Sequence, residues 1–346
     1  MFFGRISMMV FFSIVIPVRT VNDFLKENIL YLKKLDHPSF EVIIVTDAPE
    51  NYPFGDPRFK IIFSGSVGPG EKRNIGVSYA SGDVIAFLDD DAYPRSSWLQ
   101  EASEIFEQNS DLYALGGPAI TPENISFPEK MSGRIYESFL VTGNTTCRYI
   151  QRKRRFVKDY PAVNLFVKKE AFEKVGGFPI EFWPGEDTKL CLDLVKEYER
   201  PFLYDPAPVV YHHRRDVLIK HLKQVSRYGK HRGQFAKIFP GTSRLPFYFV
   251  PSIFVLGLFV GPLVAFWVPL IWYLYFSALI IYFLFLFTES CRVAFKEKSI
   301  KAFFYMYVGV FLTHIIYGTN FIWGYIKKPY LNLRDVDEET GNYTGG

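Results

Sequence analysis

The stretch VIAFLDDD, residues 84–91, places three consecutive aspartates directly after five apolar residues. A short apolar run of this kind is typical of a buried strand in a parallel sheet, and open α/β folds bind ligands at the carboxyl ends of such strands. Side chains of an extended chain alternate between faces, so we expect Asp89 and Asp91 to point one way and Asp90 another. The stretch therefore predicts an α/β fold with a ligand site at this strand end.

Two aspartates that converge on one point can bind a divalent cation. Magnesium and manganese prefer oxygen ligands, and such ions are usually held by one or two carboxylates together with the phosphates of a substrate. Asp89 and Asp91 are therefore candidate ligands of Mg²⁺ or Mn²⁺. The alternative is an exposed acidic turn that binds no ion.

Strands and helices are expected to alternate around the aspartates. Apolar runs predict strands at 13–17, 41–45, 58–63 and 83–88, and helical patterns predict helices at 23–35 and 71–80. This order is typical of a doubly wound, mostly parallel sheet. Farther along, residues 97–100 (SWLQ) resemble a capping box at the start of another helix.

The last third of the chain is too apolar for an ordinary soluble domain. Apolar residues make up 49% of the whole sequence and charged residues 22%, and no charged residue occurs from 247 to 287. Because roughly 20 apolar residues cross a bilayer, we predict about three transmembrane helices, at 247–266, 268–287 and 303–323.

Several other classes are excluded. The apolar residues 8–18 include Pro17 and fit a first buried strand better than a signal peptide. A formal net charge of +4 is too small to indicate a nucleic-acid partner. The three cysteines are far apart in the sequence, which indicates neither a disulfide framework nor a zinc site.

Basic residues predict how the chain is oriented in a membrane. They are frequent at 214–244, before the first predicted span, and at 292–301, between the second and third. The positive-inside rule then predicts an integral protein of the cell membrane, with the N-terminal domain in the cytoplasm and the tail outside. Residues 216–239 interleave apolar and basic side chains, which predicts an amphipathic helix lying on anionic membrane lipid. The expected domains are an α/β domain (1–215), an interfacial segment (216–246), transmembrane helices (247–326) and a polar tail (327–346).

Six short motifs occur in a specific order along residues 13–187. They are SIVIP at 13–17, VTD at 45–47, GEKRNIG at 70–76, FLDDD at 87–91, GGF at 176–178 and ED at 186–187. In this order the chain resembles the inverting family 2 glycosyltransferases with a GT-A fold, and within them the membrane-anchored, cellulose-synthase-like members. The resemblance covers most of residues 10–232. It implies a metal-dependent hexosyltransferase that uses a nucleotide-sugar donor, with a UDP-sugar favoured.

The resemblance assigns the nucleotide to residues at several strand ends. Asp47 is expected to contact the base, although Thr46 replaces a first acid that the family usually has here. Pro17 and Asn74 are expected to contact the nucleotide-sugar as well. The alternative for Asp47 is a helix cap or turn residue.

The Asp-x-Asp motif falls on Asp89 and Asp91. The resemblance implies that Asp89 contacts the ribose and the metal, that Asp91 binds the metal and that Asp90 lies close to the nucleotide. A divalent cation suits this place because the leaving group is a nucleoside diphosphate, whose developing charge the cation neutralises. His212 follows an apolar run and is a further candidate metal ligand, the alternative being a structural histidine.

The acidic pair Glu186 and Asp187 is expected to act on the acceptor. Inverting transfer needs a carboxylate that takes the proton of the acceptor hydroxyl as this attacks the anomeric carbon. By the family's pattern that base is Asp187, with Glu186 positioning the acceptor. The alternative is an acidic pair placed at a helix N-terminus by the helix dipole.

Residues 224–228 (QVSRY) resemble the Gln-x-x-Arg-Trp motif of cellulose-synthase-like members, with Tyr228 in place of Trp. Gln224 and Arg227 are one helical turn apart and could hold the diphosphate and the acceptor sugar. Because only a hydroxyl acceptor needs a base, the pair Glu186 and Asp187 favours a lipid-linked saccharide acceptor at the cytoplasmic face.

Two alternatives remain open. A polyprenyl phosphate acceptor is already ionised near neutrality, and the basic run 151–155 (QRKRR) could receive it. In a different class, the protein could bind nucleotide-sugars without turnover. Processive synthesis is less expected, because three helices leave little material for a polymer channel.

Overall fold

The computed structural model describes residues 9–267 and 269–327. Contacts within the chain divide them into two compact units. The first unit contains residues 9–120 and 150–212, and the second contains residues 121–149 and 213–327. The two units thus alternate along the chain, whereas the sequence suggested consecutive domains; the functional boundaries stay a prediction. Each unit is described by itself.

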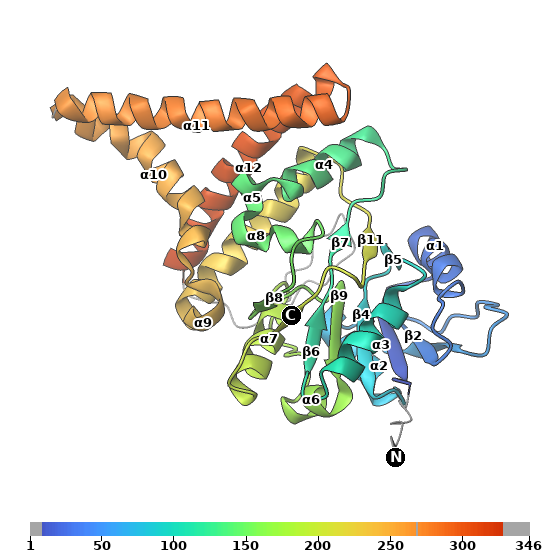
Figure 1. The fold of residues 1–346 in the computed structure, drawn as a ribbon. Helices are drawn as coiled ribbons and strands as arrows, with labels where there is room; N and C mark the ends of the chain where they lie inside the picture. The colour runs from blue at the N-terminus through green and yellow to red at the C-terminus, as the bar shows by residue number, and fades with distance from the viewer. Residues whose placement is uncertain (1–8, 268, 328–346) are drawn as a thin grey trace, which may run out of the picture. The chain divides into compact units, whose positions relative to one another are not determined.

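The first unit is built on an eight-stranded sheet with the order β3-β2-β1-β4-β9-β6-β10-β8 (Figure 1). The four strands β3, β2, β1 and β4 are mutually parallel, and β9 is antiparallel to both of its neighbours, β4 and β6. The bounds are β1 Phe12–Pro17, β2 Phe40–Thr46, β3 Phe59–Phe63, β4 Val84–Leu88, β6 Ala114–Gly116, β8 Arg155–Val157, β9 Asn164–Lys168 and β10 Phe202–Tyr204. The predicted α/β fold with a mostly parallel sheet is confirmed.

Five helices connect the strands of the first unit. They are α1 Asp23–Leu32, α2 Pro69–Ser78, α3 Trp98–Gln108, α6 Lys169–Lys174 and α7 Glu186–Glu197. The predicted capping box at Ser97 is wrong: the Ser97 hydroxyl binds the carboxylate of Glu101 at 3.0 Å and caps no backbone N–H. Ser97 has helical backbone angles, φ −78° and ψ −2°, whereas a capping side chain needs an extended residue.

The core of the first unit lies on both faces of the central strands. Every residue of β1 and of β4 is buried, which explains why their sequences are continuously apolar rather than alternating. Trp98 is fully buried against Phe166 of β9. The three aspartates follow directly after β4, at the end of one of these buried strands.

A small second sheet places one histidine beside the aspartates. Its strands are β5 Ala92–Pro94, β7 Ala119–Ile120 and β11 Val210–His212, in the order β5-β11-β7. β11 is antiparallel to β5, and His212 pairs with Ala92. Because Ala92 directly follows Asp91, this register brings residues 91 and 212 together.

The second unit is helical. Its elements are α4 Phe127–Glu137, α5 Phe139–Thr142, the 3₁₀ helix η1 Gly143–Arg148, α8 Ile219–Ile238, α9 Pro240–Ser243, α10 Pro246–Trp267, α11 Pro269–Lys296 and α12 Ile300–Ile326. As predicted, three of them are long and apolar enough to cross a membrane: α10, residues 270–296 of α11, and α12. The helix predicted at 216–239 is present as α8, and one of its faces packs against α12 through Gly229 and Gly233. The predicted tail lies outside the described residues apart from Lys327.

Candidate active site

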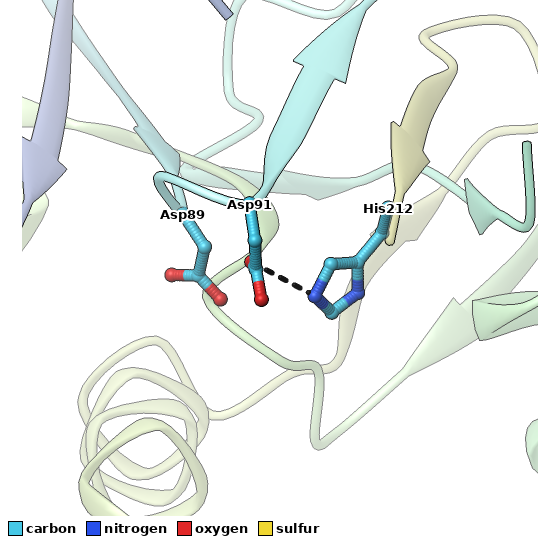
Figure 2. Close-up of side chains that lie close together, drawn as sticks. All are labelled: Asp89, Asp91 and His212. Carbon is cyan, nitrogen blue, oxygen red and sulfur yellow. Dashed lines mark ion pairs between the residues drawn. The ribbon is translucent and has the colours of Figure 1, made fainter. Parts of the chain in front are cut away.

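Three possible metal ligands converge at the carboxyl end of β4. Asp89 and Asp91 follow β4, and His212 ends β11. One ligand atom of each lies within 4.8 Å of those of the other two. Figure 2 shows the three side chains pointing toward one another, with the Nε2 atom of His212 3.1 Å from a carboxylate oxygen of Asp91. All three predicted ligands therefore belong to one group.

The chemistry of this group fits a divalent cation. Two carboxylates and one imidazole suit Mn²⁺ or Mg²⁺, whose remaining positions can be taken by water and phosphate oxygens. The side chains of Asp89, Asp91 and His212 are 30%, 36% and 19% exposed, so the group is open to a ligand from solvent.

Asp90 points away from this group. Its carboxylate accepts a hydrogen bond of 2.6 Å from the amide of Asn22, and the Asn22 side-chain oxygen caps α1 by accepting from the backbone N–H of Leu25. Burial, with a further contribution from Asp91, raises the pKa of Asp90 to about 6. The expected alternation of the three aspartates is thus present, and Asp90 connects the start of α1 to the end of β4.

Arg73 on α2 joins the predicted metal site to the predicted acceptor site. Its guanidinium donates to Asp89 at 2.7 Å and to Glu186 at 3.1 Å, and its side chain is 6% exposed. Burial opposes the charge of Arg73, but the neighbouring carboxylates, Asp89 first, outweigh it and raise the pKa of the guanidinium. One buried cation therefore holds two of the predicted site carboxylates, Asp89 and Glu186, in a common network.

The acidic pair begins α7, directly after Gly185, which has a left-handed φ of 119°. Glu186 is buried, and Asp187 is half-buried and accepts a hydrogen bond from the backbone N–H of Thr188 at 2.7 Å. Burial and the neighbouring Asp187 raise the pKa of Glu186 to about 7, although Arg73 opposes them. The pair thus occupies a helix N-terminus, as the alternative interpretation predicts. Through Arg73, Glu186 is also connected to Asp89, one of the three possible metal ligands.

A second basic residue of α2 lies at the predicted base site. Lys72 forms an ion pair with Asp47, which follows β2, and donates to the carbonyl of Val18 at 2.7 Å. Pro17, the last residue of β1, is buried immediately before that carbonyl. Burial lowers the pKa of Lys72, and Asp47 partly offsets this. Pro17 and Asp47 thus lie at the ends of the neighbouring strands β1 and β2. The Lys72 side chain reaches from α2 to both strand ends.

Comparison with known proteins agrees with this arrangement. Residues 13–176 match the family described as glycosyl transferase family 2. Residues 13–176 therefore form a family 2 glycosyltransferase domain.

Two curated relatives and one solved structure illustrate the similarity. The uncharacterized glycosyltransferase EpsJ of Bacillus subtilis (strain 168) is 26% identical over 211 residues, which are 58% of this chain and 60% of the relative. The glycosyltransferase AglE of Haloferax volcanii is 33% identical over 137 residues, 38% of this chain and 41% of the relative. The chain therefore spans about half the length of these relatives.

The mannosyltransferase PcManGT from Pyrobaculum calidifontis, solved in complex with GDP-Man and Mn²⁺, superimposes with a TM-score of 0.50. The superposition covers 67% of this chain and 65% of that protein at 16% identity. At this identity the likeness concerns the fold alone, and it agrees with the predicted fold of the glycosyltransferase domain.

Asn74 of the glycosyltransferase domain is engaged with the backbone. Its amide donates to the carbonyl of Phe178 at 2.7 Å, and its oxygen accepts from the N–H of the same residue at 2.8 Å. Gly177, with a left-handed φ of 78°, lets that loop pass close to the Asn74 oxygen. Asn74 thereby fixes the GGF segment that precedes α7, while its expected contact with the nucleotide-sugar stays a prediction.

Gln224 and Arg227 lie on α8, in the second unit. The Gln224 side chain accepts from the hydroxyl of Tyr136 at 3.2 Å and donates to the hydroxyl of Tyr228 at 2.9 Å. Tyr228, which replaces the tryptophan of the resembling motif, is thus hydrogen-bonded one turn from Gln224. The proposed contacts of Gln224 and Arg227 with diphosphate and acceptor stay predictions.

Sequence reasoning assigned no role to Lys72 and Arg73, although it used the segment that contains them. The sequence does show two adjacent basic residues in the motif at 70–76, on a predicted helix that follows a strand. Of this motif, only Asn74 was predicted to contact a ligand. A basic pair on a helix usually indicates a solvated surface, and only the buried carboxylate partners show otherwise.

Proposed function

We propose that the glycosyltransferase domain transfers a sugar, with inversion, from a nucleotide-sugar to a hydroxyl of a lipid-linked saccharide at the cytoplasmic face of the cell membrane. The observation that carries this proposal is a hydrogen-bond network: Arg73 joins Asp89, one of the three possible metal ligands, to Glu186 of the acidic pair. Donor activation and acceptor activation need to be close together, and this network connects the residues proposed for each.

The donor side would be organised by strand ends. Asp89, Asp91 and His212 would hold Mg²⁺ or Mn²⁺, and the bound cation supplies charge neutralisation for the leaving diphosphate. Asp47 would accept hydrogen bonds from the base, with its orientation set by Lys72. The mannosyltransferase of similar fold is described with GDP-Man and Mn²⁺, so GDP-sugars deserve testing beside the UDP-sugars that the sequence favours.

On the acceptor side, Asp187 would take the proton of the attacking hydroxyl. Its half-buried position at the first turn of α7 leaves it reachable by a substrate. Glu186, with a pKa of about 7, is partly protonated near neutral pH and can both donate and accept a hydrogen bond. This property suits a residue that positions a sugar hydroxyl next to the base.

A polyprenyl phosphate is the second candidate acceptor. Residues 151–155 are exposed in the structure and include four basic side chains, which could bind a lipid phosphate. Arg154 of this run already pairs with the buried carboxylate of Asp205, which holds the segment in place. A phosphate acceptor would not need Asp187 as a base, and this difference separates the two candidates.

The experiment is a screen of UDP- and GDP-sugars with and without Mn²⁺ or Mg²⁺, measured as nucleotide release by the full-length protein in native lipid extract. We expect Asp187→Asn to reduce turnover by about 10²- to 10⁴-fold while leaving nucleotide binding unchanged. Asp193→Asn is the matched control, because Asp193 lies on the same helix and pairs with Lys189 instead. No release from any donor would contradict the enzyme assignment, and unchanged turnover in Asp187→Asn would favour the phosphate acceptor.

A further inference from the structure

Three of the helices in the described part of the chain have the length and composition to cross a membrane, and their contacts show how they are arranged. The helices α10 and α11 run antiparallel to each other: Phe254 stacks on Tyr282 with ring centroids 4.2 Å apart, and Gly261 contacts the ring of Tyr275. The start of α10 and the end of α11 are therefore the open end of a helical hairpin, whose closed end lies where α10 ends and α11 begins. If both helices cross a bilayer, these two ends emerge on the same face.

The first half of α12 packs beside the end of α11. Phe303 contacts Phe287 at a centroid distance of 5.4 Å, and Tyr307 stacks on Phe283 at 6.4 Å. Leu286 and Val293 of α11 are buried in one cluster with residues of this half of α12. The helix α12 therefore starts where α11 leaves the hairpin.

The second half of α12 packs beside the start of α10. The hydroxyl of Ser252 donates to the carbonyl of Gly318 at 3.1 Å, and Phe249 contacts Phe321 at a centroid distance of 4.8 Å. Farther along, Arg244, just before α10, donates to the hydroxyl of Tyr325 at 3.3 Å. The helix α12 therefore ends where α10 begins, far along the hairpin from its turn.

A third crossing would leave a different set of contacts. If α12 crossed the membrane after α11, its end would lie level with the closed end of the hairpin, where α10 ends and α11 begins. Instead its two ends adjoin the two free ends of the hairpin, so α12 spans the open end of the hairpin. Figure 1 shows this path: α10 and α12 leave α11 at its opposite ends and approach each other near α9.

The helix α8 gives an independent reason to keep α12 out of the hydrocarbon. His221 binds Thr313, Gly229 packs on the backbone of Tyr317, and Gly233 packs on the backbone of Phe321, so α8 covers the second half of α12. This covering helix carries Lys and Arg side chains, among them six at positions 220, 223, 227, 230, 232 and 237. Each charged residue placed at the centre of a bilayer costs about 2.5–3.5 kcal/mol or more, so α8 and the α12 surface it covers belong outside.

The beginning of α12 is also tied to the part of the chain that leads to the glycosyltransferase domain. Arg134 of α4 is buried and donates to Glu297, between α11 and α12, at 2.7 Å and to Glu137 at 2.8 Å. The segment 121–149, which contains α4, is continuous at both ends with strands of the glycosyltransferase domain and contains no helix that could cross a membrane. The connection from α11 to α12 therefore lies on the same side of the membrane as that domain.

From these contacts we infer that α12 is a surface helix and not a third crossing. It lies at the membrane face from which α10 enters and to which α11 returns, with its apolar outer side on the lipid and its end on the side of the glycosyltransferase domain. The large exposed apolar side chains of α10 and α11, such as Phe259, Phe266 and Tyr273, belong to the inserted part. This places Lys327, directly after α12, on the cytoplasmic side if the domain is cytoplasmic, whereas the sequence predicts that the chain emerges outside after the third span.

The test compares the two ends of α12 in one membrane. In a parent without cysteines, Lys301→Cys and Ile326→Cys each place one thiol at an exposed position, and Gln108→Cys marks the glycosyltransferase domain. Sealed vesicles are treated with a membrane-impermeant maleimide from outside, and detergent-solubilised samples give full labelling.

We expect all three thiols to be labelled from the same side. Labelling of the Lys301→Cys and Ile326→Cys variants from opposite sides would overturn the inference. Protease digestion of a C-terminal epitope tag on the otherwise unchanged chain gives a second reading: loss of the tag must follow the side on which Gln108→Cys is labelled. Neither measurement requires sugar transfer, so the result is separate from the proposed function.

Discussion

Replacement of Arg73 by glutamine removes the cation that holds Asp89 and Glu186. The Arg73 side chain is 6% exposed and donates to the two carboxylates at 2.7 and 3.1 Å. Loss of one member of a buried ion pair costs about 3–5 kcal/mol of folding free energy, because the remaining charge stays buried without a partner. Glu186 can relieve part of that cost by binding a proton, since its pKa already lies near 7. We therefore expect the lower end, about 3 kcal/mol.

Urea unfolding of the full-length protein in detergent, followed by tryptophan fluorescence, measures this effect. With a slope of about 2 kcal/mol per molar urea, the midpoint of Arg73→Gln should fall by about 1.5 M. The matched control is Arg58→Gln, because Arg58 pairs with Asp56 at 2.7 Å while its side chain is 33% exposed. Because solvent reaches this half-buried pair, we expect it to contribute about 0–1 kcal/mol, so the control should shift by about 0.5 M or less.

A third variant distinguishes charge from geometry. Arg73→Lys keeps the charge, but an ammonium group lacks the planar fork that reaches two carboxylates at once, so we expect only partial recovery of the midpoint. The pH profile of nucleotide release should also change in Arg73→Gln, because the group that opposes protonation of Glu186 is gone. Equal midpoints for Arg73→Gln and Arg58→Gln would show that the network contributes no more than a surface pair, and the reasoning would be wrong.

Three further predictions concern the metal, pH and helix packing. His212→Ala should weaken Mn²⁺ binding, measured by calorimetry, by about tenfold or more, whereas His213→Ala should leave it nearly unchanged. Glu186 has a folded pKa of about 7, above its ordinary value of 4.5, so its contribution to stability is present below pH 4.5 and is lost as pH rises toward 7. Between pH 5 and 8 the free energy of unfolding of the unchanged protein should therefore fall by up to about 3 kcal/mol. The urea midpoints of Glu186→Gln should not show this fall. Gly233→Ala should lower the thermal unfolding midpoint, because a Cβ at this position would overlap the Phe321 backbone at a cost of about 1–3 kcal/mol. Gly257→Ala is the control and should leave the midpoint unchanged, because a Cβ there would have no atom within 4 Å. Equal midpoints for the two variants would contradict the packing of α8 on α12.

The local sequence pattern was sufficient to predict the sheet and part of the candidate site. The strands β1, β2 and β4 were predicted because both of their faces are covered, which makes their sequences continuously apolar. The direction of Asp89 and Asp91 followed from the alternation of an extended chain. The capping box at Ser97 failed because a four-residue pattern does not specify the backbone angles of its first residue.

Such local patterns do not predict which groups a charged side chain contacts. His212 meets Asp91 because β11 pairs with β5, and that register depends on strands more than 100 residues apart in sequence. Arg73 is buried because Glu186, at the start of α7, folds over α2. A basic side chain on a helix looks the same in sequence whether it faces water or two carboxylates.

The order of strands and helices, the aspartates at a strand end and three long apolar helices are consequences of side-chain pattern along the chain, and the sequence by itself determined them. The network around Arg73 and the path of α12 across the open end of a hairpin depend on which distant segments pack together. Hydropathy measures how much apolar surface a helix has, but only its neighbours decide whether lipid or protein covers that surface. The tertiary structure alone therefore distinguishes two helices that we infer to be inserted from a third that we place at the membrane face.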